Sequence, residues 1–73
     1  MKTLASVKIG EIAKVKQIHG SSMLKRRIMD MGITKNVDVE VIKFAPLGDP
    51  IELKLRGYLL SIRKEEAEQV EIF

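Results

Sequence analysis

Residues 51–62 read Ile-Glu-Leu-Lys-Leu-Arg-Gly-Tyr-Leu-Leu-Ser-Ile, and this stretch decides the fold. Every second residue from Ile51 to Leu55 is apolar and the residues between them are charged, which is the period of a strand with one buried face. Gly57 allows a tight turn, and a second alternating segment follows it. The stretch therefore predicts a β-hairpin that covers a small core with its apolar side.

Patterns on both sides of the hairpin predict three more strands. In residues 11–19, Ala13 and Val15 lie on one parity and Ile12 and Ile18 on the other. One phase slip, such as a bulge, is therefore expected in this strand. The remaining strands are predicted at residues 36–44 and 70–72, with a short helical turn at residues 64–69.

A single clear helix is predicted for residues 23–31. Leu24, Ile28 and Met31 form one apolar stripe at helical spacing. The two serines just before it offer an N-cap, and Gly32 follows the helix as a left-handed C-cap requires. The pattern and both end signals agree on the position of this helix.

Five short strands and one inserted helix predict a mainly β fold, a small SH3-like β-barrel of five to six strands. Closing the sheet on itself would bury one face and remove the strand edges. An OB-like barrel stays as the alternative, because it also uses five strands and one helix. No linker or repeat divides the sequence, so residues 1–73 are expected to form one domain.

Composition restricts the class of protein. The 73 residues include no cysteine, which excludes disulfides, thiolate metal sites and cysteine nucleophiles. The longest apolar run is Tyr58-Leu59-Leu60, too short to cross a bilayer, and the N-terminus lacks the apolar segment of a signal peptide, so the expected compartment is the cytoplasm. The net charge of +3 permits an anionic partner without requiring one.

Catalytic and metal-binding residue types are sparse. His19 is the one histidine, and neither a Ser/His/Asp set nor a glycine-rich phosphate loop is present, so we expect no enzyme and no catalytic residues. A transition metal prefers three or four nitrogen or sulfur ligands. His19 would have to recruit carboxylates such as Glu11 or Asp49, and a surface histidine is the simpler interpretation.

The basic triplet Lys25-Arg26-Arg27 lies in the middle of the predicted helix. It could contact phosphates, but the chain has only three aromatic residues to stack on bases, so nucleic-acid binding is not expected. The alternative is a solvated helix face on which Arg26 or Arg27 pairs with Asp30.

An interaction surface is the remaining hypothesis, formed by the helix together with the loop at residues 45–50. Leu47 lies between turn-forming residues, where an exposed apolar side chain is a typical docking anchor; the alternative is that it folds back to cap the barrel. Ile28, at the edge of the helical stripe, could line a docking groove. The predicted partner-binding residues are Arg26, Arg27, Ile28, Met29, Leu47 and Asp49.

Three segments resemble the FeoA family, small SH3-like proteins of ferrous-iron uptake. They are Arg27-Ile-Met-Asp-Met-Gly-Ile33, Ala45-Pro-Leu-Gly-Asp-Pro-Ile51, and Leu55-Arg-Gly57 with Leu60-Ser-Ile-Arg63. The sequence has Lys35-Asn36 where the family usually has Pro-Gly. Asparagine is the next best residue for a positive φ, so the turn is expected to survive.

The resemblance implies a cytosolic accessory protein that docks on FeoB, a ferrous-iron permease with a GTP-binding domain. It also implies transition-metal binding, with Fe(II) or another divalent ion as the candidate and no cofactor required. Weak self-association is left open. The alternative functions are a stand-alone metal sensor acting through His19, or a nucleic-acid-binding SH3-like module.

Overall fold

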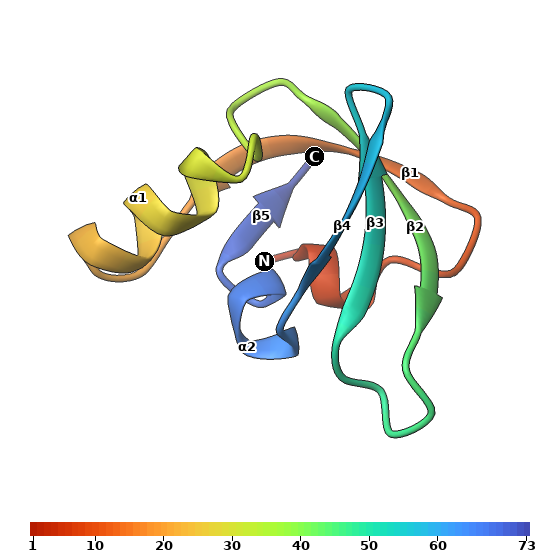
Figure 1. Ribbon diagram of the computed structural model, residues 1–73. Coiled ribbons are helices and arrows are strands. Elements are labelled where there is room, and N and C mark those ends of the chain that lie inside the picture. Colours follow the sequence, from red (N-terminus) through yellow and green to blue (C-terminus); the bar gives the residue numbers. More distant parts are fainter.

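The computed structural model describes residues 1–73 as one small, strongly curved sheet with short helices around it (Figure 1). None of the helices has the length and apolar character needed to cross a membrane. The elements follow the chain in the order η1 (Leu4–Ser6), β1 (Ile12–Ile18), α1 (Ser22–Asp30), β2 (Asp38–Phe44), β3 (Ile51–Leu55), β4 (Tyr58–Ile62), α2 (Lys64–Ala67) and β5 (Val70–Ile72).

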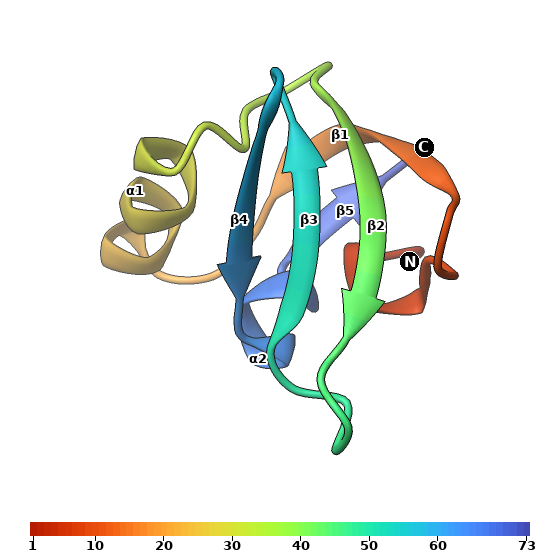
Figure 2. The same cartoon turned by 45° about the vertical axis from the view of Figure 1, so that its right-hand side comes forward.

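The five strands form one antiparallel sheet in the order β4-β3-β2-β1-β5. The sheet curls around the core, and β5 lies across from β4 (Figures 1 and 2). The predicted mainly β, SH3-like fold with one inserted helix is confirmed. The predicted closure is wrong, because β4 and β5 do not pair. The chain passes between them through α2, and η1 packs against α2 and β5, so these two helices cover the gap.

Two β-bulges bend the sheet. The register of β1 against β5 shifts between Val15 and Gln17, which confirms the phase slip expected from the parity of the apolar residues. A second shift lies in β2 between Val41 and Lys43, opposite β3. Because a bulge increases the local twist, these two positions let a five-stranded sheet curl tightly enough to enclose one core.

The turn of the β3–β4 hairpin and the turn before β2 both contain residues with the positive φ angles expected from the sequence. The hairpin has a two-residue turn in which Arg56 and Gly57 have φ of 50° and 82°, the left-handed pair that matches strand twist. Asn36 has φ of 70°, so the asparagine that replaces the glycine usual in the family does adopt a positive φ.

The core lies inside the curl and draws on every strand. Leu4 of η1 and Ile28 of α1 are also fully buried, so the 3-10 helix and the inserted helix both contribute to this core. The buried apolar residues are Leu4, Val7, Ala13, Val15, Ile18, Ile28, Ile33, Val39, Val41, Ile51, Leu53, Leu55, Ile62, Ala67, Val70 and Ile72.

Candidate docking surface

Helix α1 spans Ser22–Asp30, one residue earlier at each end than the predicted 23–31. The Oγ of Ser21 accepts a hydrogen bond from the backbone N–H of Leu24 at 3.1 Å, which caps the first turn. Gly32, with φ of 100°, follows the last turn. The helix is attached to the sheet only along one stripe, so most of its surface is available to a partner.

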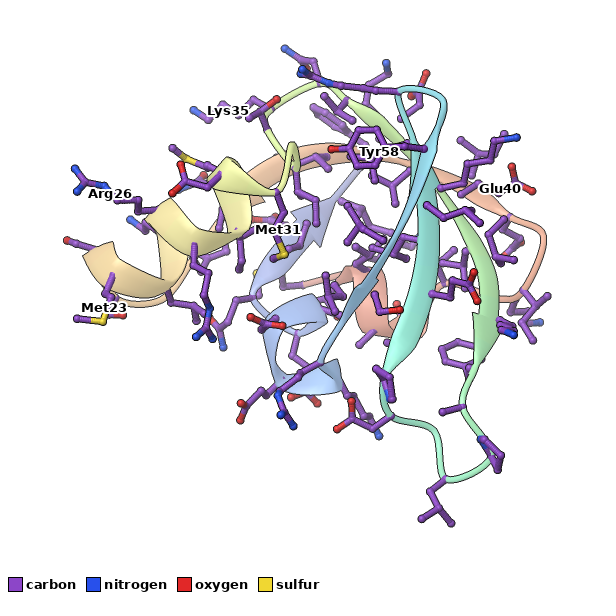
Figure 3. The ribbon with its side chains drawn as sticks, viewed as in Figure 1. Met23, Arg26, Met31, Lys35, Glu40 and Tyr58 are labelled. Carbon is purple, nitrogen blue, oxygen red and sulfur yellow. The ribbon has the colours of Figure 1, made fainter.

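The exposed face of α1 carries apolar and basic side chains together. Met23 is 84% exposed and Met29 48% exposed, and Arg26 is also exposed between them. Figure 3 shows Arg26 and Met23 pointing away from the molecule, whereas Met31 points inward. Methionine adapts its shape to a partner, and arginine can bind a carboxylate with two parallel hydrogen bonds. This face therefore has the chemistry of a protein-binding surface.

Among the predicted partner-binding residues, Ile28 is buried, and Arg27 has an internal contact although its side chain stays 62% exposed. Ile28 is 0% exposed, so it belongs to the core and cannot contact a partner; α1 lies against the sheet with this edge of its apolar stripe turned inward, while Leu24 and Met31 are only partly buried. Arg27 does not pair with Asp30, because its Nη2 lies 2.9 Å from Oε2 of Glu66 in α2. Arg27 thus ties the inserted helix to the rest of the fold.

The β2–β3 loop, residues 45–50, presents both Leu47 and Asp49 at the surface. Leu47 is 97% exposed, so it does not fold back over the barrel. Asp49 is used within the fold, since its Oδ1 accepts a hydrogen bond from the backbone N–H of Lys64 at 3.0 Å and so caps the first turn of α2. Leu47 makes no such internal contact, and Asp49 stays exposed as well, so partner binding by both loop residues stays a prediction.

The predicted joint surface of helix and loop does not form. Helix α1 and the β2–β3 loop lie at different ends of the molecule in both views (Figures 1 and 2). The reason is topological, because α2 lies between them and binds each one, α1 through Arg27 and the loop through Asp49. A partner would meet the face of α1 and Leu47 as two separate contacts.

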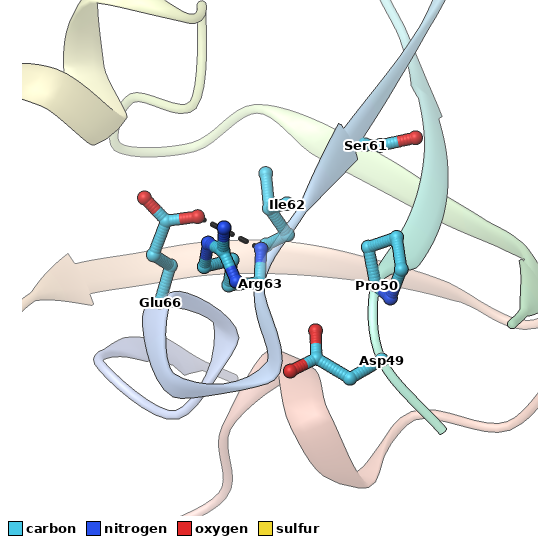
Figure 4. Close-up of a pocket in the computed structure, with 6 residues that line it drawn as sticks. All are labelled: Asp49, Pro50, Ser61, Ile62, Arg63 and Glu66. Atoms are coloured by element: carbon cyan, nitrogen blue, oxygen red, sulfur yellow. Dashed lines mark hydrogen bonds between the residues drawn. The ribbon is translucent and has the colours of Figure 1, made fainter. Parts of the chain in front are cut away.

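A polar cleft of about 360 Å³ lies beside α2 (Figure 4). Glu66 is buried there, and its Oε1 accepts a hydrogen bond from the N–H of Arg63 at 2.8 Å while its Oε2 binds Arg27. Asp49, the other carboxylate of the cleft, is occupied by α2. Both carboxylates hold α2 in place. The lining residues are Asp49, Pro50, Ser61, Ile62, Arg63 and Glu66.

His19 lies at the end of β1, where its Nε2 is 2.8 Å from Oε1 of Glu71 in β5. Neither Glu11 nor Asp49 joins it, and no group of three His, Asp or Glu side chains in residues 1–73 is arranged to hold a metal ion. Because transition-metal sites need three or four ligands, this pair of side chains is incomplete as a site. Fe(II) binding through His19 stays a prediction.

The His19–Glu71 pair makes stability depend on acid pH. The hydrogen bond from His19, with help from the charge of Lys16, lowers the pKa of Glu71 below its usual 4.5. A carboxyl with a lowered pKa stabilises the fold above its unfolded pKa, and this contribution is lost as the pH falls through the folded value. We expect the thermal midpoint of the wild type to fall more steeply than that of Glu71→Gln between about pH 5 and pH 3. Equal slopes in the two proteins would contradict this.

Sequence reasoning missed the role of Glu66. Glu66 occupies the third position of α2 and accepts from the backbone N–H of Arg63, which is one half of a capping box. Residue 63 is arginine rather than the serine or threonine of that motif, so the signal in the sequence was weak. It also missed Tyr58, whose hydroxyl donates to the carbonyl of Met31 and so joins β4 to the end of α1. No local pattern predicts that contact, because 27 residues separate the two partners.

A curled five-stranded antiparallel sheet with one inserted helix defines a small SH3-like domain. A Stenotrophomonas maltophilia FeoA complexed with zinc, described as an SH3 domain protein, shares this fold with a TM-score of 0.85, at 22% identity over 100% of this chain and 91% of that one. The FeoA domain model matches residues 2–72, and the chain belongs to the FeoA family, which is related to ferrous-iron transport.

Two further comparisons agree with this membership. A FeoA-like protein of Clostridium acetobutylicum is 44% identical, with a TM-score of 0.90 over 97% of this chain and 83% of that one. An Fe(2+) transport protein A/Fe(2+) transporter FeoB fusion protein of Porphyromonas gingivalis is 29% identical over 69 residues. That match covers 94% of this chain and 8% of the fusion protein, so the chain corresponds to a small part of that polypeptide.

Proposed function

We propose that this chain is a cytosolic accessory protein of ferrous-iron uptake. It docks on the cytoplasmic part of a FeoB-like ferrous-iron permease, the part that carries the GTP-binding domain. The observation that carries the proposal is the Porphyromonas gingivalis fusion protein, whose name joins an Fe(2+) transport protein A to the transporter FeoB in one polypeptide. Two domains that work together gain a high effective concentration when they are linked in this way.

The described surface supports a docking role without catalysis. Leu47 and the outer face of α1 are exposed and apolar or basic, while the residues beneath them are fixed by the core and by α2. A preformed surface loses little conformational entropy on binding. Such a domain can regulate the permease only by binding one of its states better than another. The function we propose therefore needs no metal and no substrate of its own.

Co-purification with the transporter tests the proposal. Tagged wild-type chain is mixed with detergent-solubilised FeoB-like permease from the same genome, and the recovered permease is measured. We expect Leu47→Asp and Arg26→Glu to lower recovery about tenfold, because each removes an anchor, with unchanged thermal midpoints. Leu59→Asp is the matched control, since Leu59 is 58% exposed on β4 and lies outside the proposed contacts.

The outcomes separate the partner from the surface. If wild-type chain recovers no permease, the proposed function is wrong. If it recovers permease and both variants recover as much as the Leu59→Asp control, the partner is right and the assigned contacts are wrong.

A further inference from the structure

A second hollow lies between the end of β1 and one flank of α1, and we call it the β1–α1 groove. It has a volume of about 230 Å³ and is lined by Gln17, Ile18, Lys25, Met29 and Lys35. Pockets that hold small molecules are usually about 300–1,000 Å³. The groove is smaller than these and open to solvent, so its size suits one inserted side chain better than a cofactor.

The groove has an apolar floor and a basic rim. Met29, half-exposed, supplies the accessible apolar surface. Lys25 and Lys35 line the groove together with it, and neither lies within 4.0 Å of a carboxylate. No acidic residue lines the groove. Its electrostatic complement is therefore a segment that carries carboxylates around an aliphatic side chain.

Another open hollow, of about 330 Å³, lies along the first part of α1. It is lined by Ser22, Met23 and Arg26, so it repeats the combination of a methionine with a cation. Figure 3 shows Arg26 and Lys35 projecting from the same side of the molecule. At 100° per residue, Lys25, Arg26 and Met29 occupy one arc of the helix, opposite the stripe that enters the core. A partner segment could follow this arc for about one turn.

Contacts on the opposite flank of α1 hold the helix in place and leave the flank that borders the groove exposed. Ile28 is fully buried, and Arg27 is bound to Glu66 of α2 at 2.9 Å. These contacts fix the helix against the fold and leave the flank of Lys25 and Met29 without an internal partner. The groove is thus held open by interactions on the opposite side of the helix.

A nucleic acid fits this groove less well than a peptide. Readers of single strands stack bases on aromatic side chains beside a basic track. None of the residues that line the two hollows is aromatic. The exposed aromatic residues Tyr58 and Phe73 lie on β4 and at the C-terminus. Lysine around an apolar methionine favours a protein partner over phosphates.

We propose that the β1–α1 groove binds an acidic segment of the permease's cytoplasmic part, with one aliphatic side chain on Met29 and carboxylates on Lys25 and Lys35. This inference rests on the proposed function for the identity of the partner and names the surface that makes the contact. The groove is separate from Leu47, so each contact can be removed without the other.

Two pairs of charge-matched variants test the groove on the permease. Lys25→Glu/Lys35→Glu is compared with Lys2→Glu/Lys8→Glu, which changes the net charge equally at exposed lysines elsewhere. Met29→Asp is compared with Leu59→Asp. By calorimetry with the purified cytoplasmic part of the permease, we expect about tenfold or greater loss of affinity for both groove variants and less than about twofold for the controls. Raising the salt concentration should weaken wild-type binding and leave the charge-reversed protein nearly unaffected.

A peptide experiment tests whether the groove binds an acidic segment even if the permease is not the partner. Isotope-labelled chain is titrated with acetyl-Glu-Glu-Leu-Glu-Glu-amide and followed by NMR. We expect chemical-shift changes at the residues that line the groove. Replacing the central leucine of the peptide by alanine should weaken binding at least about fivefold. A peptide in which lysines replace the glutamates should not bind.

The results of these experiments distinguish a failure of the groove proposal from a failure of the proposed function. Loss of binding in the groove variants alone supports the inference. Permease binding that the groove variants keep overturns it and leaves the proposed function standing. If the permease does not bind, the proposed function fails, and the peptide titration alone decides the groove. Peptide shifts spread over other faces, or tighter binding of an oligonucleotide of similar charge to the groove, overturn the inference.

Discussion

Replacing Ile28 by alanine is expected to lower the free energy of unfolding by about 2–5 kcal/mol. Ile28 has no exposed surface and packs in the core cluster where α1 meets the sheet. Truncation removes buried methyl groups and leaves a cavity that a rigid curled sheet fills only in part. A domain of this size has a total stability of only about 4–11 kcal/mol, so the loss is a large share of it. Urea denaturation of both proteins measures the difference.

Met29→Ala is the matched control for Ile28→Ala, because it truncates the next residue of the same helix at a half-exposed position. It is expected to cost under about 1 kcal/mol. If Ile28→Ala does not fold, Ile28→Val, with an expected loss of about 0.5–1.5 kcal/mol, replaces it. Equal effects at Ile28 and Met29 would contradict the assignment of Ile28 to the core and return it to the docking surface.

Local signals in the sequence account for most of the correctly predicted fold. The alternation of Ile51 to Leu55 with its tight turn produced the β3–β4 hairpin, and the serine cap and Gly32 bounded α1. Even the bulge in β1 was visible, because Ile12 and Ile18 lie on the wrong parity for one regular strand. These features depend on neighbours within a few residues, so the sequence states them directly.

The features that sequence reasoning missed depend on residues far apart in the chain. β4 and β5 do not pair with each other, and the outer edge of β5 instead meets the N-terminal residues, where the N–H of Ile72 donates to the carbonyl of Lys2 at 3.0 Å. η1 itself has three residues, too few for a periodic pattern. Likewise, the bond between Arg27 and Glu66 joins two helices separated by three strands, so no spacing rule predicts it.

Contacts between distant residues also explain why only part of the candidate docking surface was predicted correctly. Helical periodicity put Arg26 and Met29 on the exposed face correctly. For Leu47 the sequence left two alternatives, and the structure shows the exposed one. Arg27, Ile28 and Asp49 have the same exposed-loop or helix-edge signature, yet each meets an internal partner or the core. Lys35 lines the β1–α1 groove although it lies five residues beyond the end of the helix. Only the three-dimensional fold brings it next to the helix residues of the groove.

Gly32→Ala is the second substitution with a large expected effect, about 2–3 kcal/mol. Gly32 has φ of 100°, a conformation that costs an L-residue roughly 1–2 kcal/mol. A Cβ at this position would also collide with the hydroxyl of Tyr58, which donates to the carbonyl of Met31. Displacing Tyr58 would break that bond and add roughly 1 kcal/mol. Urea denaturation of the variant and the wild type measures the total.

The two contributions to the Gly32 effect can be separated. Gly48 has φ of 86° and open space around its Cβ position, so Gly48→Ala measures the backbone cost alone. In a Tyr58→Phe background the colliding oxygen is gone, and Gly32→Ala should then cost about as much as Gly48→Ala. If Gly32→Ala costs the same with tyrosine as with phenylalanine at position 58, the collision does not occur. In that case the contact between β4 and the end of α1 does not hold the helix in place.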